Sequence, residues 1–193
     1  MSLTLCSEAL SGCTGCEMAL LNTAGGSLDL LDKFEILHMP ILMDHKYFGC
    51  WGATNDIHIP KAALGLISGA IRNEEQLLIA EKMRGRCGIV IAFGTCAAYG
   101  GIPALINLFE DEDLFQRYYR GAEGTDAAPN PVQVIPPFLE RTFALDEKIA
   151  VDFVLPGCPP HPDRVSALLE SIIDGKAPVW PLVSVCDSCP TKR

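Results

Sequence analysis

Residues 88–96 read GIVIAFGTC, an apolar run that ends in glycine, threonine and cysteine. A short run rich in branched aliphatic side chains is typical of a strand buried on both faces of a sheet. The same features recur in order at residues 151–158, VDFVLPGC. The two segments predict two strands, each followed just past its carboxyl end by a cysteine, Cys96 or Cys158.

The rest of the chain alternates in the same way between strand-like and helix-like segments. Strands are expected at residues 3–5, 34–39 and 62–69, and helices at residues 17–31 with a break at Gly25-Gly26, 74–83 after a capping Asn73, and 163–173. This alternation predicts an α/β fold, with a parallel sheet covered by helices on both faces. Such sheets bind ligands beyond the carboxyl ends of their strands.

The length of the chain indicates one domain with a short appendage. At 193 residues it fits a single core, which we assign to residues 1–180, followed by a tail of residues 181–193. Residues 109–142 are charged and then rich in glycine, alanine and proline, so we expect an irregular excursion over the surface there. The chain shows no internal repeat.

The composition excludes several classes of function. The net charge is −9 and no cluster of Lys and Arg occurs, so a nucleic-acid partner is not expected. The apolar runs are interrupted well short of the ~20 residues that span a bilayer. The N-terminus shows no secretory pattern, which leads us to expect a cytoplasmic protein. Nine cysteines in such a protein indicate metal or redox chemistry rather than disulfides.

Four cysteines have the spacing of an iron–sulfur site. Cys13 and Cys16 form a CTGC pair, while Cys96 and Cys158 stand alone on separate loops. Four thiolates are the ligand set of a [4Fe–4S] cluster, and the glycines beside them let the backbone approach the sulfurs. A structural zinc site usually combines two complete CxxC or similar pairs, so zinc is the weaker alternative. Buried cysteines with no metal role are a further one.

Three other features allow two interpretations each. Glu17 follows the first pair, where it is either an acidic residue favoured by the helix dipole or a carboxylate on a proton path. Cys186 and Cys189 form a second pair near the C-terminus, which is either a free exposed pair or half of a site whose other ligands lie elsewhere. The remaining cysteines and the four histidines are expected to be core or surface residues: Cys6, Cys50, Cys87, His38, His45, His58 and His161.

Taken together, the motifs resemble the small subunit of [NiFe]-hydrogenases, in particular the cytoplasmic methyl-viologen-reducing type that does not reduce the deazaflavin coenzyme. The resemblance runs from about Cys13 to Cys189 and rests on five motifs in order: CTGCEMALL, ILMDHKYFG, GAIRNEE, AFGTCAAYGGIP and PGCPP. In methanogens that type works with heterodisulfide reductase. The chain stops at Arg193, whereas longer relatives continue past the last cysteine pair into a segment that binds two more clusters.

The resemblance implies a flavodoxin-like fold with a cluster in place of the flavin. Cys13, Cys16, Cys96 and Cys158 would bind the proximal [4Fe–4S] cluster, and Glu17 would match an acidic residue of this subgroup. The cluster would relay electrons between the Ni–Fe site of a separate large subunit and a downstream acceptor. Further partners would be electron-transfer subunits, linked to heterodisulfide reductase or carrying flavin and iron–sulfur groups. We also expect an exposed apolar patch for the large subunit.

Four competing functions were weighed against this resemblance. A quinone-reducing subunit of the complex I type shares the fold but carries two adjacent cysteines, where this chain has Cys13-Thr14-Gly15-Cys16. A hydrogenase large subunit would be longer and would end in a different cysteine motif. A flavodoxin-like FMN carrier would need a phosphate-binding loop rich in Ser and Thr after the first strand. A zinc-stabilised α/β module remains open to metal analysis.

Overall fold

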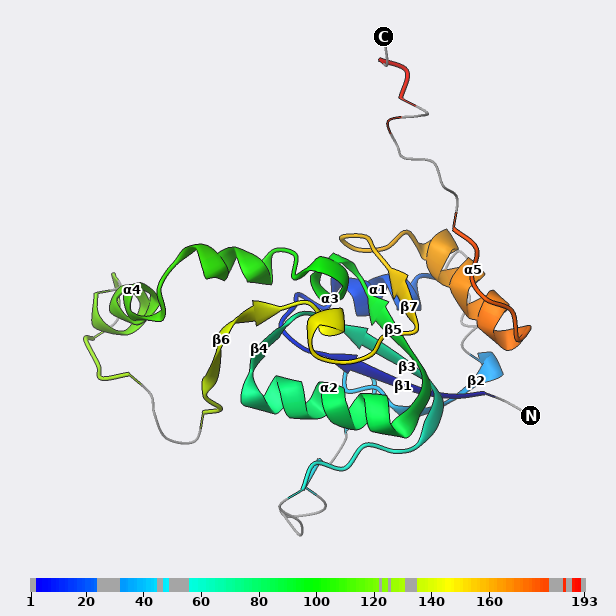
Figure 1. The fold of residues 1–193 in the computed structure, drawn as a ribbon, viewed down its shortest axis with the longest axis horizontal. Helices are drawn as coiled ribbons and strands as arrows, with labels where there is room; N and C mark the ends of the chain where they lie inside the picture. Colours follow the sequence, from blue (N-terminus) through cyan, green and yellow to red (C-terminus); the bar gives the residue numbers. More distant parts are fainter. Residues whose placement is uncertain are drawn as a thin grey trace.

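The computed structural model describes residues 3–23, 32–44, 47–48, 56–121, 123–124, 126–130, 135–180, 186 and 189–191. Its main sheet has five strands in the order β2-β1-β3-β5-β7, and every neighbouring pair is parallel (Figure 1). These strands are β1 (Leu3–Ala9), β2 (Phe34–His38), β3 (Ala62–Ser68), β5 (Cys87–Phe93) and β7 (Phe153–Leu155). The order is that of a flavodoxin-like sheet, so the predicted fold class is confirmed.

Helices cover both faces of this sheet, each over its own apolar core. On one face α2 (Glu74–Arg86) packs Ile79, Ala80 and Met83 against the strands. On the other, α1 (Gly15–Leu21) and α5 (Pro162–Ile173) pack Leu20 and four apolar residues of α5 against the alternate strand positions. Because successive residues of a strand point to opposite faces, a single apolar strand serves both cores.

Several boundaries differ from those predicted. The first strand continues to Ala9, four residues past the predicted end. The prediction ended the strand too early because Ser7 and Glu8 are polar, although both are buried in the structure. The predicted helix 17–31 is a helix over Gly15–Leu21, and residues 24–31 lie outside the described part of the chain. The predicted capping of α2 is confirmed, since the side chain of Asn73 accepts a hydrogen bond from the backbone N–H of Gln76 at 2.8 Å.

The region predicted to be an irregular excursion contains a second, small sheet. Strand β6 (Phe138–Phe143) pairs antiparallel with β4 (Ile71–Asn73). Short helical segments lead to it along the edge of the molecule: α3 (Thr95–Tyr99), η4 (Pro103–Leu108), α4 (Asp111–Phe115) and η5 (Gln116–Arg120), while η6 (Leu145–Glu147) follows. The expectation of an irregular excursion was therefore wrong for residues 111–120, which are helical, and for residues 138–142, which form a strand. The strand was not predicted because its partner is only three residues long and lies 65 or more positions away.

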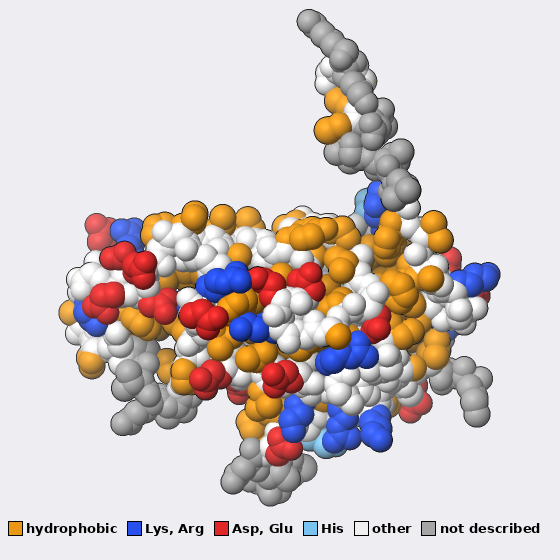
Figure 2. Space-filling model, viewed as in Figure 1, with side chains coloured by type: hydrophobic (Ala, Val, Ile, Leu, Met, Phe, Trp, Pro, Cys, Tyr) orange, Lys and Arg blue, Asp and Glu red, His pale blue; other side chains and the backbone are white. Residues whose placement is uncertain are grey.

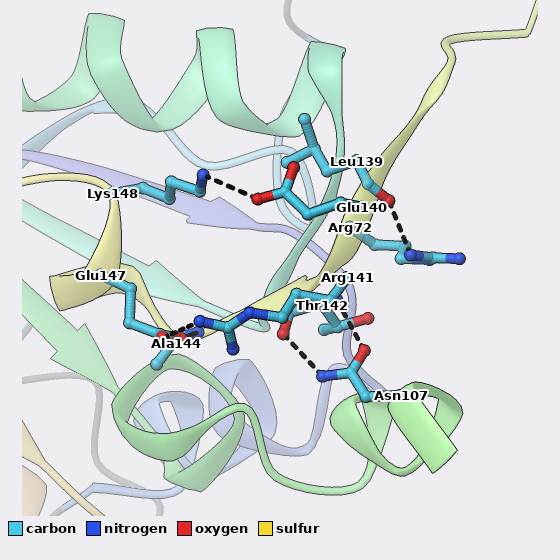
Figure 3. A network of polar contacts seen from close by, with 9 residues as sticks. All are labelled: Arg72, Asn107, Leu139, Glu140, Arg141, Thr142, Ala144, Glu147 and Lys148. Atoms are coloured by element: carbon cyan, nitrogen blue, oxygen red, sulfur yellow. Dashed lines mark hydrogen bonds and ion pairs between the residues drawn. The ribbon is translucent and has the colours of Figure 1, made fainter. Parts of the chain in front are cut away.

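Polar side-chain contacts add to the apolar packing of Ile71 and Phe143 in holding this small sheet in place (Figure 3). The amide of Asn107 bridges the backbone of Thr142, donating to its carbonyl at 2.9 Å and accepting from its N–H at 2.7 Å. Arg72 donates to the carbonyl of Leu139 at 2.9 Å and pairs with Asp111. Glu147 accepts from Arg141 and from the backbone N–H of Ala144. These contacts anchor the excursion to the edge of the main domain.

Two glycines on the α2 side of the molecule provide a test of the packing. Gly65 on β3 has no room for a side chain, since an added Cβ would lie 2.8 Å from Cys87 Sγ and 3.0 Å from Cys87 Cβ. We expect Gly65→Ala to lower the free energy of unfolding by ~1–3 kcal/mol through overpacking. The measurement is denaturant unfolding of the full chain.

Gly85 in α2 is the matched control, because an added Cβ there meets no atom within 4 Å. Gly85→Ala is expected to raise the free energy of unfolding by ~0.5–1 kcal/mol, the usual gain for alanine in a helix. Equal effects of the two substitutions would contradict the packing described for β3 and β5.

A cysteine-lined cavity at the carboxyl edge of the sheet

The four predicted cysteines lie around one cavity of about 110 Å³, at the carboxyl ends of the central strands. Cys13 and Cys16 lie on the turn between β1 and α1, Cys96 in α3 directly after β5, and Cys158 in the loop after β7. Parallel pairing brings these three loops to the same edge. A tertiary contact thus unites residues that are up to 145 positions apart in the chain.

Glycine makes the close approach of the loops feasible at two positions. An added Cβ at Gly94, whose φ is 90°, would lie 2.2 Å from Cys16 Sγ. An added Cβ at Gly101, whose φ is 52°, would lie 3.0 Å from Cys96 Sγ. Any larger residue at either position would displace a thiol from the cavity, and the positive φ angles also favour glycine.

Backbone geometry also fixes the loops relative to one another. Thr14, between the first two cysteines, has the left-handed φ of 63° that β-branched residues rarely adopt. The loops after β5 and β7 are joined twice, since Thr95 N–H donates to the Gly157 carbonyl at 2.8 Å and Gly157 N–H donates to Thr95 Oγ1 at 3.1 Å. These hydrogen bonds hold two of the cavity's loops side by side.

The electrostatics of the cavity favour a cationic occupant. Burial, the carboxylate of Glu17 and the other three cysteines raise the pKa of Cys16 to about 12. Burial and the neighbouring Cys158 and Cys13 raise the pKa of Cys96, against hydrogen bonds that lower it. Burial and like charge thus disfavour the thiolate form of Cys16 and Cys96 unless positive charge lies nearby.

The four thiols line the cavity without forming a compact single-ion site. Within the described residues, no group of three or more His, Cys, Asp or Glu side chains is gathered closely enough to bind one metal ion. Four thiolates are the ligand set that a [4Fe–4S] cluster requires.

Glu17 lies in the wall of the same cavity. It is 2% exposed, and its Oε1 accepts a short hydrogen bond from the hydroxyl of Ser68. Its Oε2 is buried and has no hydrogen-bond partner among the described residues. A buried carboxylate with one unsatisfied oxygen is costly. The side chain is thus placed at the site rather than on the solvent face of α1.

The other cysteines lie elsewhere. Cys6 and Cys87 are buried in the core beside α2, as predicted, and Cys50 lies outside the described residues. Cys186 and Cys189 do not line the cavity, and the N–H of Cys189 donates to the Cys186 carbonyl at 3.4 Å. The assignment of residues 181–193 as a separate tail falls mostly on residues outside the described part.

Sequence reasoning missed one cluster of polar side chains near the site. His38, predicted to be a surface or packing residue, is fully buried, and its Nε2 lies 2.6 Å from Glu8 Oε2. The hydroxyl of Tyr47 donates to the same oxygen at 2.5 Å. Glu8 lies at a buried position of β1, an unusual place for an acid, but beyond the predicted end of that strand, so the sequence carried no signal for it.

Comparison with known proteins assigns the chain to a family. The sequence model of the "NADH ubiquinone oxidoreductase, 20 Kd subunit" family matches residues 13–172. The chain is 37% identical over 206 aligned positions to the iron–sulfur subunit of the F420-non-reducing hydrogenase of Archaeoglobus profundus, covering 98% of this chain and 63% of that protein. The chain thus spans less than two thirds of the length of this relative.

In two further comparisons, the match covers most of the length of the related protein. The delta subunit of the NAD-reducing hydrogenase HoxS of Cupriavidus necator is 30% identical over 172 residues, which are 86% of this chain and 77% of that protein. A chain of the crystal structure of an NAD+-reducing [NiFe]-hydrogenase in the H2-reduced state superposes with a TM-score of 0.79 and 26% identity, covering 94% of this chain and 97% of that chain. No helix in the described ranges is long and apolar enough to cross a membrane. The chain belongs to the NADH ubiquinone oxidoreductase 20 Kd subunit family, and within it to the small subunits of [NiFe]-hydrogenases.

Proposed function

We propose that this chain is the electron-transfer subunit of a cytoplasmic [NiFe]-hydrogenase and that Cys13, Cys16, Cys96 and Cys158 bind a [4Fe–4S] cluster. The observation that carries the proposal is the meeting of these four thiols around one cavity. When bound, the cluster accepts and donates one electron at a time. The chain's own residues would supply the thiolates and hold the loops by the bonds between Thr95 and Gly157.

An apolar surface beside the cavity supports a large subunit as the partner. Exposed apolar side chains follow the loop of Cys96 along α3 and η4: Tyr99, Ile102, Leu105, Leu108 and Phe109. Figure 2 shows hydrophobic side chains gathered along this edge of the molecule. Apolar patches of this kind mark interaction sites. A large subunit docked here would cover the cluster face and shorten the path of the electron from the Ni–Fe site.

The downstream acceptor is a further subunit, either linked to heterodisulfide reductase or carrying flavin and iron–sulfur groups. Cys186 and Cys189 are the candidate ligands of a second cluster at the contact with that subunit. Two thiolates do not complete a [4Fe–4S] site, so a second cluster there needs ligands from outside this chain. A quinone reductase of the complex I type is the alternative that the family model allows, but the two residues between Cys13 and Cys16 disfavour it.

The ligand assignment predicts the metal content of the native complex. After subtraction of clusters held by other subunits, about four irons per copy of this chain are expected, the content of one cubane cluster. The measurement is iron, sulfide and zinc analysis with EPR on anaerobically purified complex. About eight irons would assign a second cluster to the Cys186 pair. Zinc without iron would overturn the proposal and leave a structural module.

Cys96→Ala and Cys158→Ala are expected to abolish H2-dependent dye reduction, because three thiolates leave one iron of the cluster without its ligand. The same variants should lose iron and the EPR signal of the cluster. Cys87→Ala is the control, since Cys87 is buried in the other core and far from the cavity lining. Full activity and iron content in Cys96→Ala would contradict the assignment.

We propose that Glu17 carries protons to or from the cavity. Its unsatisfied Oε2 and its burial support this role over that of a residue placed by the helix dipole. Glu17→Gln is expected to slow H2 turnover by about a hundredfold or more, the usual effect of losing one proton-transferring group, without removing iron. Turnover and H/D exchange at wild-type rates would return Glu17 to a structural role.

A further inference from the structure

The chain turns back over Cys96 directly after α3. The N–H of Gly100 donates to the Cys96 carbonyl at 2.9 Å and ends the helix. Gly100 and Gly101 then follow with positive φ angles of 82° and 52°. Two successive residues with such angles change the direction of the chain sharply, and glycine adopts them without strain. Residues 100–102 thus form a compact turn, the glycine turn, which brings Ile102 back toward the cysteine.

The backbone of the glycine turn packs directly against Cys96. An added Cβ at Gly101 would lie 2.9 Å from Cys96 Cα, 3.0 Å from its backbone nitrogen and 3.0 Å from its Sγ. An added Cβ at Gly100 would lie 2.7 Å from the Cβ of Ala104. Neither glycine can take a side chain without a shift of the turn, so the position of the Ile102 peptide relative to the cysteine is closely determined.

This turn provides the sulfur of Cys96 with a hydrogen-bond donor. Burial raises the pKa of Cys96, whereas hydrogen bonds from the backbone of Ile102 and of Cys96 itself lower it, as N–H donors to a thiolate do. The carbonyl of Ile102 accepts from the Leu105 N–H at 3.1 Å, which holds the residue from its other side. The peptide of Ile102 therefore contacts the ligand, while its side chain is 69% exposed on the apolar surface.

A donor to a ligand sulfur acts differently on the two redox states of a cluster. The reduced state carries one electron more than the oxidised state, and the sulfurs share the added negative charge. An N–H donor stabilises the more negative state more strongly, in the same way that it stabilises a thiolate relative to a thiol. Such a donor therefore raises the reduction potential, and its removal lowers that potential.

We propose that the backbone N–H of Ile102, positioned by the glycine turn, donates to the sulfur of Cys96 in the cluster-bound protein and raises the reduction potential of the cluster. The inference rests on the proposed function. One electron at a time arrives from the side of the Ni–Fe site and leaves to the acceptor, and no covalent bond of this chain forms or breaks. The donor changes only the energy at which that electron is held. Ile102 thus has a positioning role through its peptide, in addition to its side chain on the apolar surface.

The test is Ile102→Pro in the purified complex, because proline removes the N–H and keeps the backbone path. The φ of Ile102 is −61°, within the range that proline adopts, and Gly101 before it has no Cβ to clash with the ring. The midpoint potential is measured by redox titration followed by EPR. At a fixed potential, the ratio of reduced to oxidised cluster is expected to fall about tenfold, a shift of ~59 mV for one electron. Iron content should stay at the wild-type value.

Ile102→Ala is the matched control at the same position. It removes the exposed side chain, as the proline variant does, but it keeps the backbone N–H. Its midpoint potential is expected to equal that of the wild type. The comparison therefore separates loss of the donor from loss of the side chain.

A hyperfine measurement tests the same hydrogen bond without the proline variant. With 15N-isoleucine incorporated into the complex, pulsed EPR of the reduced cluster is expected to show a 15N coupling that is transmitted through the N–H···S hydrogen bond. Ile102→Val keeps the backbone donor but places an unlabelled residue there. The coupling should therefore disappear in Ile102→Val, while its midpoint potential stays at the wild-type value.

Three results would overturn the inference. The first is an unchanged midpoint potential in Ile102→Pro with full iron content. The second is an equal fall in Ile102→Pro and Ile102→Ala, which would assign the effect to the side chain. The third is an identical 15N spectrum in the wild type and Ile102→Val, which decides the matter if the proline variant fails to assemble. A wild-type complex without iron in this chain would instead refute the proposed function itself, so the two failures are distinguishable.

Discussion

The parallel pairing of neighbouring strands is the constraint on which the site depends. Strand β3 pairs with β1 and with β5, and β5 pairs with β7. Parallel strands end at the same edge, so the loops that follow them converge whatever their separation along the chain. Burial, Glu17 and the neighbouring cysteines raise the pKa of Cys16 to about 12. Under the proposed function, a cluster bound by the four thiolates would offset this cost and would stabilise the loops that carry them.

The sheet can impose this convergence because it is anchored on both faces. The core beneath α2 and the core beneath α1 and α5 use alternate residues of the same strands. A loop at the edge cannot shift without disturbing one of these cores, and interiors packed at this density deform little. The glycines at positions 94 and 101 then let the loops close to contact distance of the sulfurs. Rigid strands and compact loops together produce a preformed cavity.

The polar residues buried near the cavity are stabilised by hydrogen bonds, unlike the residues of the apolar cores. Glu8, Glu17, His38 and Ser68 are all at most 4% exposed, although each loses hydration on burial. Most of that loss is offset by the bonds of Glu8 to His38 and Tyr47 and of Ser68 to Glu17. Buried polar networks of this kind are retained where chemistry requires them. Glu8 and His38 lie on β1 and β2, apart from the apolar surface along α3 and η4.

The sequence by itself determined the fold class, the identity of the four cysteines at the sheet edge and the capping of α2 by Asn73, because each depends on local pattern: apolar runs of strand length, glycine beside cysteine, and a polar residue before a helix. It did not predict β6, whose short partner β4 lies 65 or more residues away and whose position depends on Arg72 and Asn107. It also did not predict the contacts of Glu8 with His38 and Tyr47. These features arise from residues on β1, β2 and the segment after it, and only tertiary packing brings such residues together. Local sequence patterns predict secondary structure and candidate ligands, whereas the neighbours of a buried side chain are determined by the tertiary fold.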